Sequence, residues 1–332
     1  MKESIYIQAT RKAWHFAWGH KILWFFGIFA AFLGQFGMVE FLGKISVHSI
    51  PIESYFGNVG TLMAQVGKFV ISAGYSFDSK FFLFFLLALI FSLVLVAAFV
   101  AVASQGLLLY ACAQSIKGKK INIMKSWHVG AANFWRLFFL NFFKKIIIAV
   151  IAIILSLSAY GVLLSPSIPN SIALTLLVIL LGFIGLVLSF LFFYSAGYVV
   201  IEKENLSVAI QKAWVMFVGH PIVSFEVGLL VVVLNLFFGL FAAFGFILFV
   251  LPAVLFWFVV VLLGGSQIAL VSAFIASLIM FTMYIMVVAA GFAVFTSYIW
   301  TYVFLEMHDK GIKSRLMHFI RFLRGIRNKN NN

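Results

Sequence analysis

The hydrophobic and polar positions of the chain follow two alternating patterns. Long apolar runs, each of about 20 residues or more, alternate with short segments in which apolar residues recur at helical spacing among basic and aromatic ones. A run of this length crosses the hydrocarbon core of a bilayer as a helix. A short segment with one apolar and one basic side lies in the interface instead. The pattern predicts an all-α, polytopic transmembrane protein.

The apolar runs predict six long helices. We place them at residues 22–43, 81–113, 146–164, 171–201, 221–243 and in a last span that ends at residue 305. The run at 81–113 makes a helix longer than the hydrocarbon core is thick, which predicts a tilted or protruding helix. The stretch 44–80 is the only sizeable polar loop.

Residues 244–265 leave the number of spans open. No charged residue occurs between Glu226 and Glu306. If the six-span pattern holds, 244–265 dips into the bilayer as a re-entrant hairpin, with Pro252 near its middle. Otherwise the stretch contributes two further spans and the total is eight. Both alternatives leave the C-terminus on the same side, so charge does not choose between them.

The short segments resemble one another, which indicates an internal repeat. Aligned on tryptophan, three of them share a lysine, a small residue, the tryptophan and, six residues later, histidine or asparagine. The four sets are Lys12, Lys125 and Lys212; Ala13, Ser126 and Ala213; Trp14, Trp127 and Trp214; and His20, Asn133 and His220. Each unit then consists of a short interfacial helix, here called an elbow, an outward span and a returning span.

The repeat sets the predicted domain organisation. Residues 1–332 form one membrane domain with units at 4–113, 121–201 and 206–305. An amphipathic C-terminal helix at 306–327 follows them. Because paired spans of the same orientation recur, we expect the units to be related by a pseudo-threefold axis along the membrane normal.

Composition supports an integral membrane protein and excludes a soluble domain. Of the 332 residues, 64% are hydrophobic and only 10% are charged, against about 45–50% and about 25% in soluble domains. The single cysteine, Cys112, excludes an intramolecular disulfide and a cysteine-based metal cluster. No catalytic motif is present, so the sequence predicts no enzyme, no cofactor and no metal.

The basic residues predict the topology. The formal net charge is +14, and of the 23 Lys and Arg residues only three lie in the 44–80 loop. The others lie near the N-terminus, at 117–145 and 203–212, and in the C-terminal tail. This bias orients both termini toward the cytoplasm of a cell inner membrane. It favours anionic lipids as partners and argues against nucleic acid.

The repeated residues are the first candidate site. Tryptophan settles at headgroup depth, and a neighbouring lysine reaches lipid phosphate, so Trp14, Trp127 and Trp214 with their lysines predict headgroup contacts. His20, Asn133 and His220 could surround the axis as a metal or proton site. Their spacing does not require convergence, and the preferred interpretation is that they end the elbows and hydrogen-bond to the next helix.

Glu226, Lys144 and Lys145 are the second candidate site, because ionisable side chains within spans are functional candidates by default. Glu226 could carry a proton, pair with Lys144 or Lys145, or reach the inner headgroups. For the two lysines we favour a second elbow that extends to Lys145. The alternative is that the pair is buried and faces a partner.

Two stretches resemble a known group of proteins. They are YVVIEKENLSVAIQKAWVMFVGHPIVSF at 198–225 and IMKSWHVGAANFWRLFFL at 123–140. They resemble a broad group of poorly characterised prokaryotic membrane proteins, which includes the membrane domain fused to some glycerophosphodiester phosphodiesterases. The resemblance implies a six-helix membrane domain of no settled biochemical role. The chain has no soluble segment that could form the phosphodiesterase barrel.

The sequence therefore predicts a non-enzymatic, lipid-interacting scaffold or assembly protein, whose partners are anionic lipids and copies of itself or other membrane proteins. The alternative is a transporter or channel for a small molecule or lipid, with a path along the repeat axis. A lipid-modifying enzyme is a weaker third. A polar cavity lined by Glu226, Asn141, Asn235 or Gln267 would favour transport, and a dry, Phe-packed axis would favour a scaffold.

Overall fold

The computed structural model describes residues 5–34, 77–263 and 267–310. Within these ranges the chain forms nine helices and no strand, and five of the helices are long and apolar enough to cross a membrane. The predicted all-α class is confirmed within these ranges, and the five long apolar helices support a multi-pass membrane protein. In chain order the helices are α1 (Ile5–Gly19), α2 (Ile22–Gly34), α5 (Phe77–Ile116), α6 (Ile123–Ala132), α7 (Phe134–Leu164), α8 (Ile168–Ile201), α9 (Leu206–Gly219), α10 (Pro221–Leu263) and α11 (Gln267–Lys310).

Three short helices, α1, α6 and α9, are each followed by another helix, α2, α7 and α10 respectively, after a break of one or two residues. Asn122 begins α6, where its side-chain oxygen accepts from the Lys125 amide at 3.0 Å and so satisfies one of the unpaired N–H groups of the first turn. Pro221 begins α10, a position at which the missing N–H costs no intrahelical bond. The cap at Asn122 and the proline at position 221 thus set where α6 and α10 begin.

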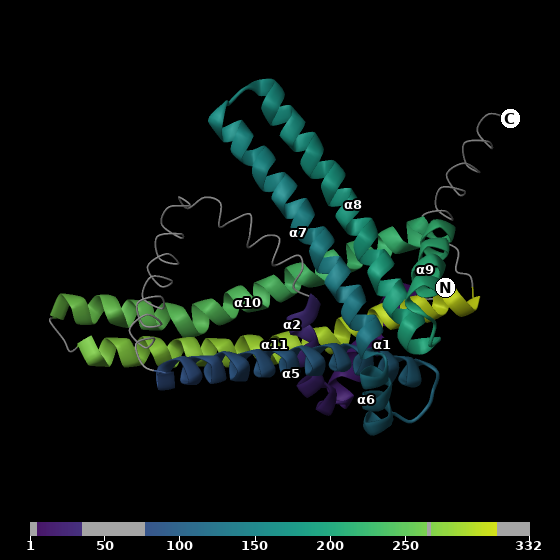
Figure 1. Cartoon of the computed structure of the whole chain (residues 1–332), viewed down its shortest axis with the longest axis horizontal. Coiled ribbons are helices and arrows are strands. Elements are labelled where there is room, and N and C mark those ends of the chain that lie inside the picture. The colour runs from purple at the N-terminus through teal and green to yellow at the C-terminus, as the bar shows by residue number, and fades with distance from the viewer. Residues whose placement is uncertain (1–4, 35–76, 264–266, 311–332) are drawn as a thin grey trace.

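Each short helix packs on a long helix from another part of the chain. Helix α6 packs on α5, α9 packs on α8, and α1 packs on α11. The helices α5, α8 and α11 also contact one another. The short helices gather around the end at which α5, α8 and α11 finish (Figure 1).

The apolar core lies at this end. One cluster takes buried residues from the last turns of α5, α8 and α11 and from α9, among them Leu109, Tyr194, Val199, Ala213 and Phe304. A second cluster joins α1 and α2 to α5 and α11 through residues that include Ala13, Leu23, Leu108 and Ile299. The core holds the three long helices together where the short helices cover them.

Close backbone approach contributes to this packing at Gly130 of α6. A Cβ atom there would lie 2.3 Å from the Ala103 carbonyl oxygen of α5, and one at Gly106 would lie 2.8 Å from the Gly130 Cα atom. Only glycine at these positions lets the two helices cross at this distance. The crossing fixes α6 on α5.

The long helices diverge away from the core (Figure 1). Helices α7 and α8 form a hairpin that leaves at an angle, whereas α10 and α11 run together beside α5. At 43 and 44 residues, α10 and α11 are each about 65 Å long at about 1.5 Å per residue. A bilayer core is about 30 Å thick, so these helices must tilt strongly or protrude from it.

The structure corrects the expectation for residues 244–265. Helix α10 runs without interruption from Pro221 to Leu263 through Pro252, so this stretch forms neither a re-entrant hairpin nor two further spans. A transmembrane helix accommodates an internal proline when a neighbouring side chain satisfies the disrupted turn. Here the Ser277 hydroxyl of α11 donates to the Phe249 carbonyl, three residues before Pro252.

The structure also corrects the expected length of the second elbow. Helix α6 ends at Ala132, and α7 begins at Phe134 and includes both Lys144 and Lys145. A break at Asn133, rather than the charge of the two lysines, sets the boundary.

Several expectations lie outside the described residues. They concern the end of the first span at 35–43, the outer loop up to residue 76, and the C-terminal amphipathic helix beyond Lys310.

Candidate functional site

The residues around the repeated tryptophans occupy similar environments in α1, α6 and α9. The small residue before each tryptophan, Ala13, Ser126 or Ala213, is 0% exposed. Trp14 and Trp214 are 59% and 52% exposed. Trp127 is half-buried, with its ring centroid 5.8 Å from that of Phe26. In each short helix the small residue faces the protein, while the tryptophan that follows it is exposed or half-buried.

The three lysines of these helices are exposed, and two of them also have partners within the protein. The Lys12 ammonium lies 5.1 Å from the centroid of the Tyr302 ring. Lys212 forms an ion pair with Glu204 in the turn before α9. The lysines are therefore positioned by the protein at the surface where the short helices gather.

His20, Asn133 and His220 directly follow the last residue of α1, α6 and α9. The backbone N–H of each bonds to the carbonyl four residues earlier, at 3.1, 3.2 and 3.1 Å. The side chains of His20 and Asn133 also bond back, to the Phe16 and Val129 carbonyls, because a helix C-terminus offers unpaired acceptors and not donors. The expected bond to the next helix is also present. The Asn133 side-chain oxygen accepts from the Arg136 guanidinium of α7 at 3.2 Å. The backbone carbonyls of all three residues accept from an N–H of the helix that follows, at 2.9, 3.0 and 3.1 Å.

These three residues do not form a metal centre in the described part of the chain, where no three His, Cys, Asp or Glu side chains gather. His220 differs from the other two, since its buried Nδ1 has no hydrogen-bond partner there.

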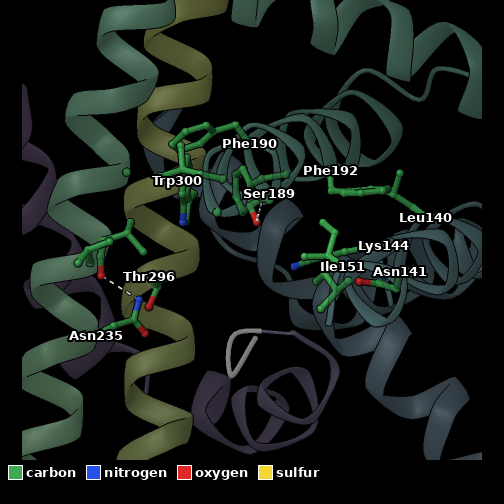
Figure 2. Close-up of a pocket in the computed structure, with 18 of the residues that line it drawn as sticks. Leu140, Asn141, Lys144, Ile151, Ser189, Phe190, Phe192, Asn235, Thr296 and Trp300 are labelled. Carbon is green, nitrogen blue, oxygen red and sulfur yellow. Dashed lines mark hydrogen bonds between the residues drawn. The ribbon is translucent and has the colours of Figure 1, made fainter. Parts of the chain in front are cut away.

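A cavity of about 390 Å³ lies where the α7–α8 hairpin diverges from α10 and α11. Its walls come from α5, α7, α8, α10 and α11. Figure 2 shows polar side chains on both sides of it, with Lys144 and Asn141 on one side and Asn235 and Thr296 on the other. The polar residues that line it are Gln105, Asn141, Lys144, Ser189, Asn235, Thr296 and the indole-bearing Trp300.

Asn141 connects the lysine side of the cavity to α5. Its amide nitrogen donates to the Gln105 side-chain oxygen at 2.7 Å and to the Leu137 carbonyl at 2.9 Å. Asn141 is only 8% exposed, so these bonds hold it in place. Lys144 lies three residues further along α7 and hence on the same side of the helix, and its side chain is half-buried.

The polar groups of the other walls bond back to their own helices. The Asn235 amide donates to the Val231 carbonyl at 2.8 Å, and the Ser189 hydroxyl donates to the Gly185 carbonyl at 2.9 Å. The Thr296 hydroxyl donates to the Phe292 carbonyl. Because the hydroxyl protons of Ser189 and Thr296 are used within their helices, their oxygens can accept from water or a ligand, whereas Asn235 offers both an oxygen and a second amide N–H.

Aromatic rings form the boundary between the cavity and the apolar core. Phe190 and Trp300 belong to both, and their ring centroids lie 5.7 Å apart. Phe193 stacks on Trp300 with centroids 4.6 Å apart. A Cβ atom at Gly228 would lie 2.4 Å from the Phe190 ring, so the glycine lets α10 approach that ring.

The structure separates the three ionisable residues of the second candidate site. Lys144 lines the cavity, whereas Lys145 is exposed and Glu226 is absent from the lining. Asn141 and Asn235, named from the sequence as lining candidates, do line it. The side chain of Gln267 lies outside the described residues.

Sequence reasoning missed Gln105, Ser189 and Thr296. Gln105 carried a usable signal, since it is a lone amide inside a long apolar run, as Asn141 and Asn235 are. Serine and threonine carry a weaker signal, because they commonly bond to their own helix in apolar segments.

Comparison with known proteins identifies no relative. No protein-family model matches the chain, and neither a curated protein nor a solved structure does.

Proposed function

We propose that this chain is a non-enzymatic integral membrane protein that interacts with lipid, and that the cavity between its diverging hairpins holds a membrane lipid. One observation carries the proposal: a partly polar cavity of about 390 Å³ continues into apolar helix surfaces. This volume lies within the range of about 300–1,000 Å³ that is usual for sites of small ligands.

The walls of the cavity suit hydrocarbon. Apolar side chains line it on three helices, among them Ile151, Leu155, Leu186 and Val231. Beyond the cavity, the same two hairpins expose large apolar residues such as Leu157, Phe183 and Leu240. The surface that surrounds the cavity is therefore apolar as well.

The apolar core favours a scaffold or lipid-holding role over a through-channel. Along α5, α8 and α11 the cluster that contains Leu109, Val199 and Phe304 lies beyond the cavity, toward the ends that the short helices cover. An ion-coupled path would need charged groups there, and none of the buried polar residues in the described part of the chain is charged. Transport of a lipid remains the second candidate, because the cavity itself is partly polar.

The packing order supports the proposed three-unit architecture. Each short helix packs on the returning helix of the preceding unit: α6 on α5, α9 on α8 and, closing the ring, α1 on α11. A cyclic order of this kind is what a pseudo-threefold arrangement of repeats requires. We propose three elbow-span-span units on this basis.

The orientation follows from charge. The exposed lysines of α1, α6 and α9 gather at the end of the molecule where the apolar core lies, which supports a cytoplasmic location for that end and for both termini, in the cell inner membrane. Lys12, Lys125 and Lys212, with the adjacent tryptophans, would contact anionic headgroups. Further copies of the chain or other membrane proteins are proposed partners.

A cavity-filling variant tests the proposed function. Gly185 lines the cavity, and a Cβ atom there would meet no atom within 4 Å. We therefore expect Gly185→Phe to occupy the cavity while the fold is retained, and the lipid that stays with the protein after delipidating purification to fall severalfold. Native mass spectrometry measures that lipid.

The matched control is Gly161→Phe on α7, where a Cβ atom also meets no atom within 4 Å and which does not line the cavity. It should retain as much lipid as the unmodified protein. Equal retention by both variants would contradict a lipid site in this cavity.

A further inference from the structure

One hydrogen-bond donor in the wall of the cavity has no acceptor within the described part of the chain. The indole N–H of Trp300 makes no hydrogen bond there, although the side chain is only 9% exposed and lines the cavity. Buried tryptophans usually bond their N–H, because a donor without an acceptor costs free energy. A ligand that supplies an acceptor atom would satisfy this group.

The neighbours of Trp300 hold its ring and direct the N–H into the cavity. Phe193 stacks on the ring, and Phe190 meets it edge-on. In Figure 2 the indole nitrogen points away from Phe190, toward the part of the cavity between Ser189 and Thr296. An indole N–H only donates, and packing holds this one in place, so the group that it binds must be an acceptor.

The walls of the cavity favour an acceptor that is attached to hydrocarbon. Apart from the polar residues named above, apolar side chains and glycines line the cavity. A water molecule or a polar solute could accept from Trp300, but either would leave these apolar walls without an apolar partner. The carbonyl oxygen of a lipid ester meets both requirements, because it is an acceptor and directly adjoins an acyl chain.

The position of Trp300 along α11 matches the depth of lipid esters in a bilayer. Helix α11 packs on α1, where the Phe16 ring lies 4.7 Å from that of Tyr298. Trp300 is two residues beyond Tyr298, or about 3 Å along the helix axis. The exposed tryptophans of α1 place this helix in the interface, and ester groups join the headgroups of the interface to the acyl chains. The Trp300 N–H therefore lies at the level of the ester carbonyls.

We propose that the cavity binds an acyl-ester lipid of the surrounding bilayer, and that the carbonyl oxygen of one ester accepts a hydrogen bond from the Trp300 indole N–H. This inference rests on the proposed function and adds the chemical group that is recognised and the residue that recognises it. An ether-linked lipid, in which a methylene replaces each carbonyl, offers no such acceptor and should bind less tightly.

The test compares two lipids that differ only in this linkage. The full chain is incubated in detergent with equimolar dioleoylphosphatidylcholine and its diether analogue, and bound lipid is counted by native mass spectrometry. Because the headgroup is shared, charge does not contribute to the comparison. The unmodified protein should prefer the diester about fivefold, the effect of one hydrogen bond between neutral groups. Trp300→Phe should retain both lipids equally, since phenylalanine keeps an aromatic ring but has no N–H.

Trp135→Phe is the matched control, because Trp135 of α7 is 66% exposed and does not line the cavity. It should keep the preference for the diester, whereas Gly185→Phe, which fills the cavity, should abolish it. A preference that survives Trp300→Phe or Gly185→Phe, or one that Trp135→Phe abolishes equally, would overturn the assignment of Trp300.

The unmodified protein also tests the inference without any substitution, so a folding defect in Trp300→Phe does not remove the test. Equal retention of diester and diether by the unmodified protein would overturn the recognition of an ester and leave the proposed function standing. Retention of neither lipid would instead refute the proposed function.

Discussion

At the scale of single residues, the small side chains of the short helices pack against the protein, whereas two of the neighbouring tryptophans face outward. Ala13, Ser126 and Ala213 are fully buried, while Trp14 and Trp214 are more than half exposed. A small side chain lets each short helix approach the long helix beneath it, and the adjacent aromatic ring stays available to the interface. The lysine, small residue and tryptophan therefore form a compact pattern with a physical reason for each position.

One buried hydrogen bond joins two of the long helices near the core. The Tyr194 hydroxyl of α8 and the Ser224 hydroxyl of α10 lie 2.9 Å apart, and both residues are 0% exposed. Ser224 also bonds to the His220 carbonyl at 3.1 Å. Loss of Ser224 leaves the buried Tyr194 hydroxyl without this partner, whereas loss of the Tyr194 hydroxyl leaves Ser224 its bond to His220.

We therefore expect Tyr194→Phe to lower the free energy of unfolding by about 0.5–1.5 kcal/mol. Ser224→Ala should cost at least as much, because it also removes the bond to His220, and the double variant should cost less than the sum because both changes remove the same bond between the helices. Unfolding in mixed micelles measures these differences. Tyr160→Phe is the control, since Tyr160 is 54% exposed. Strict additivity of the two changes would show that the bond contributes nothing.

Residue patterns predicted contacts along one helix better than contacts between helices. His20, Asn133 and His220 were placed at helix ends, where they lie. The expected side-chain bond to the next helix is present at Asn133, which accepts from Arg136 of α7. The His20 ring bonds to its own helix instead, because a helix C-terminus presents unpaired carbonyls. The pairing suggested for Glu226 with Lys144 or Lys145 required the register of α10 against α7, which no local pattern contains.

At the scale of helices, the boundaries that could be predicted from the sequence are those next to charged residues or proline. The start of α9 at Leu206, the start of α10 at Pro221 and the end of α8 at Ile201 agree with the sequence, because charged or proline-containing turns flank them. The long uncharged stretch that follows Glu226 carries no such signal. Pro252 was read as a break, but a membrane helix tolerates proline when a neighbour satisfies the affected turn.

The continuity of α10 is directly measurable. With Cys112 replaced by alanine, spin labels at Phe244→Cys and Leu262→Cys would lie about 27 Å apart along a helix at about 1.5 Å per residue. Both sites are exposed, so labels should not disturb packing. Pulsed electron paramagnetic resonance gives the separation.

A re-entrant hairpin centred on Pro252 would return residue 262 to the level of residue 244 and give a much shorter distance. The same label pair in Pro252→Ala serves as a control, since removing the proline should leave the helical separation unchanged.

At the scale of the whole molecule, the fold combines an apolar core at one end with two helical hairpins that diverge from it. The apolar cluster of α5, α8 and α11 holds one end together, and the α7–α8 hairpin leaves the other long helices at an angle (Figure 1). The cavity lies where these two regions meet. Because five helices contribute to it, the sequence could name Asn141 and Asn235 as polar residues but could not show that they share a cavity.

The arrangement also gives a reason for the length of the helices. Helices such as α10 and α11 exceed the thickness of a bilayer core when upright. When two hairpins diverge from one another, at least one of them is tilted, and tilt shortens the length that a helix projects along the membrane normal. Lipid between the hairpins would then fill the space that divergence opens.

The most direct test of the account is a cryo-EM structure of the full chain in nanodiscs that contain phosphatidylglycerol. The account predicts that the α7–α8 hairpin stays apart from α10 and α11, with lipid density in the cavity between them. A structure in which the hairpins close together and the side chains of α7 and α10 fill the cavity, with lipid only at α1, α6 and α9, would contradict it.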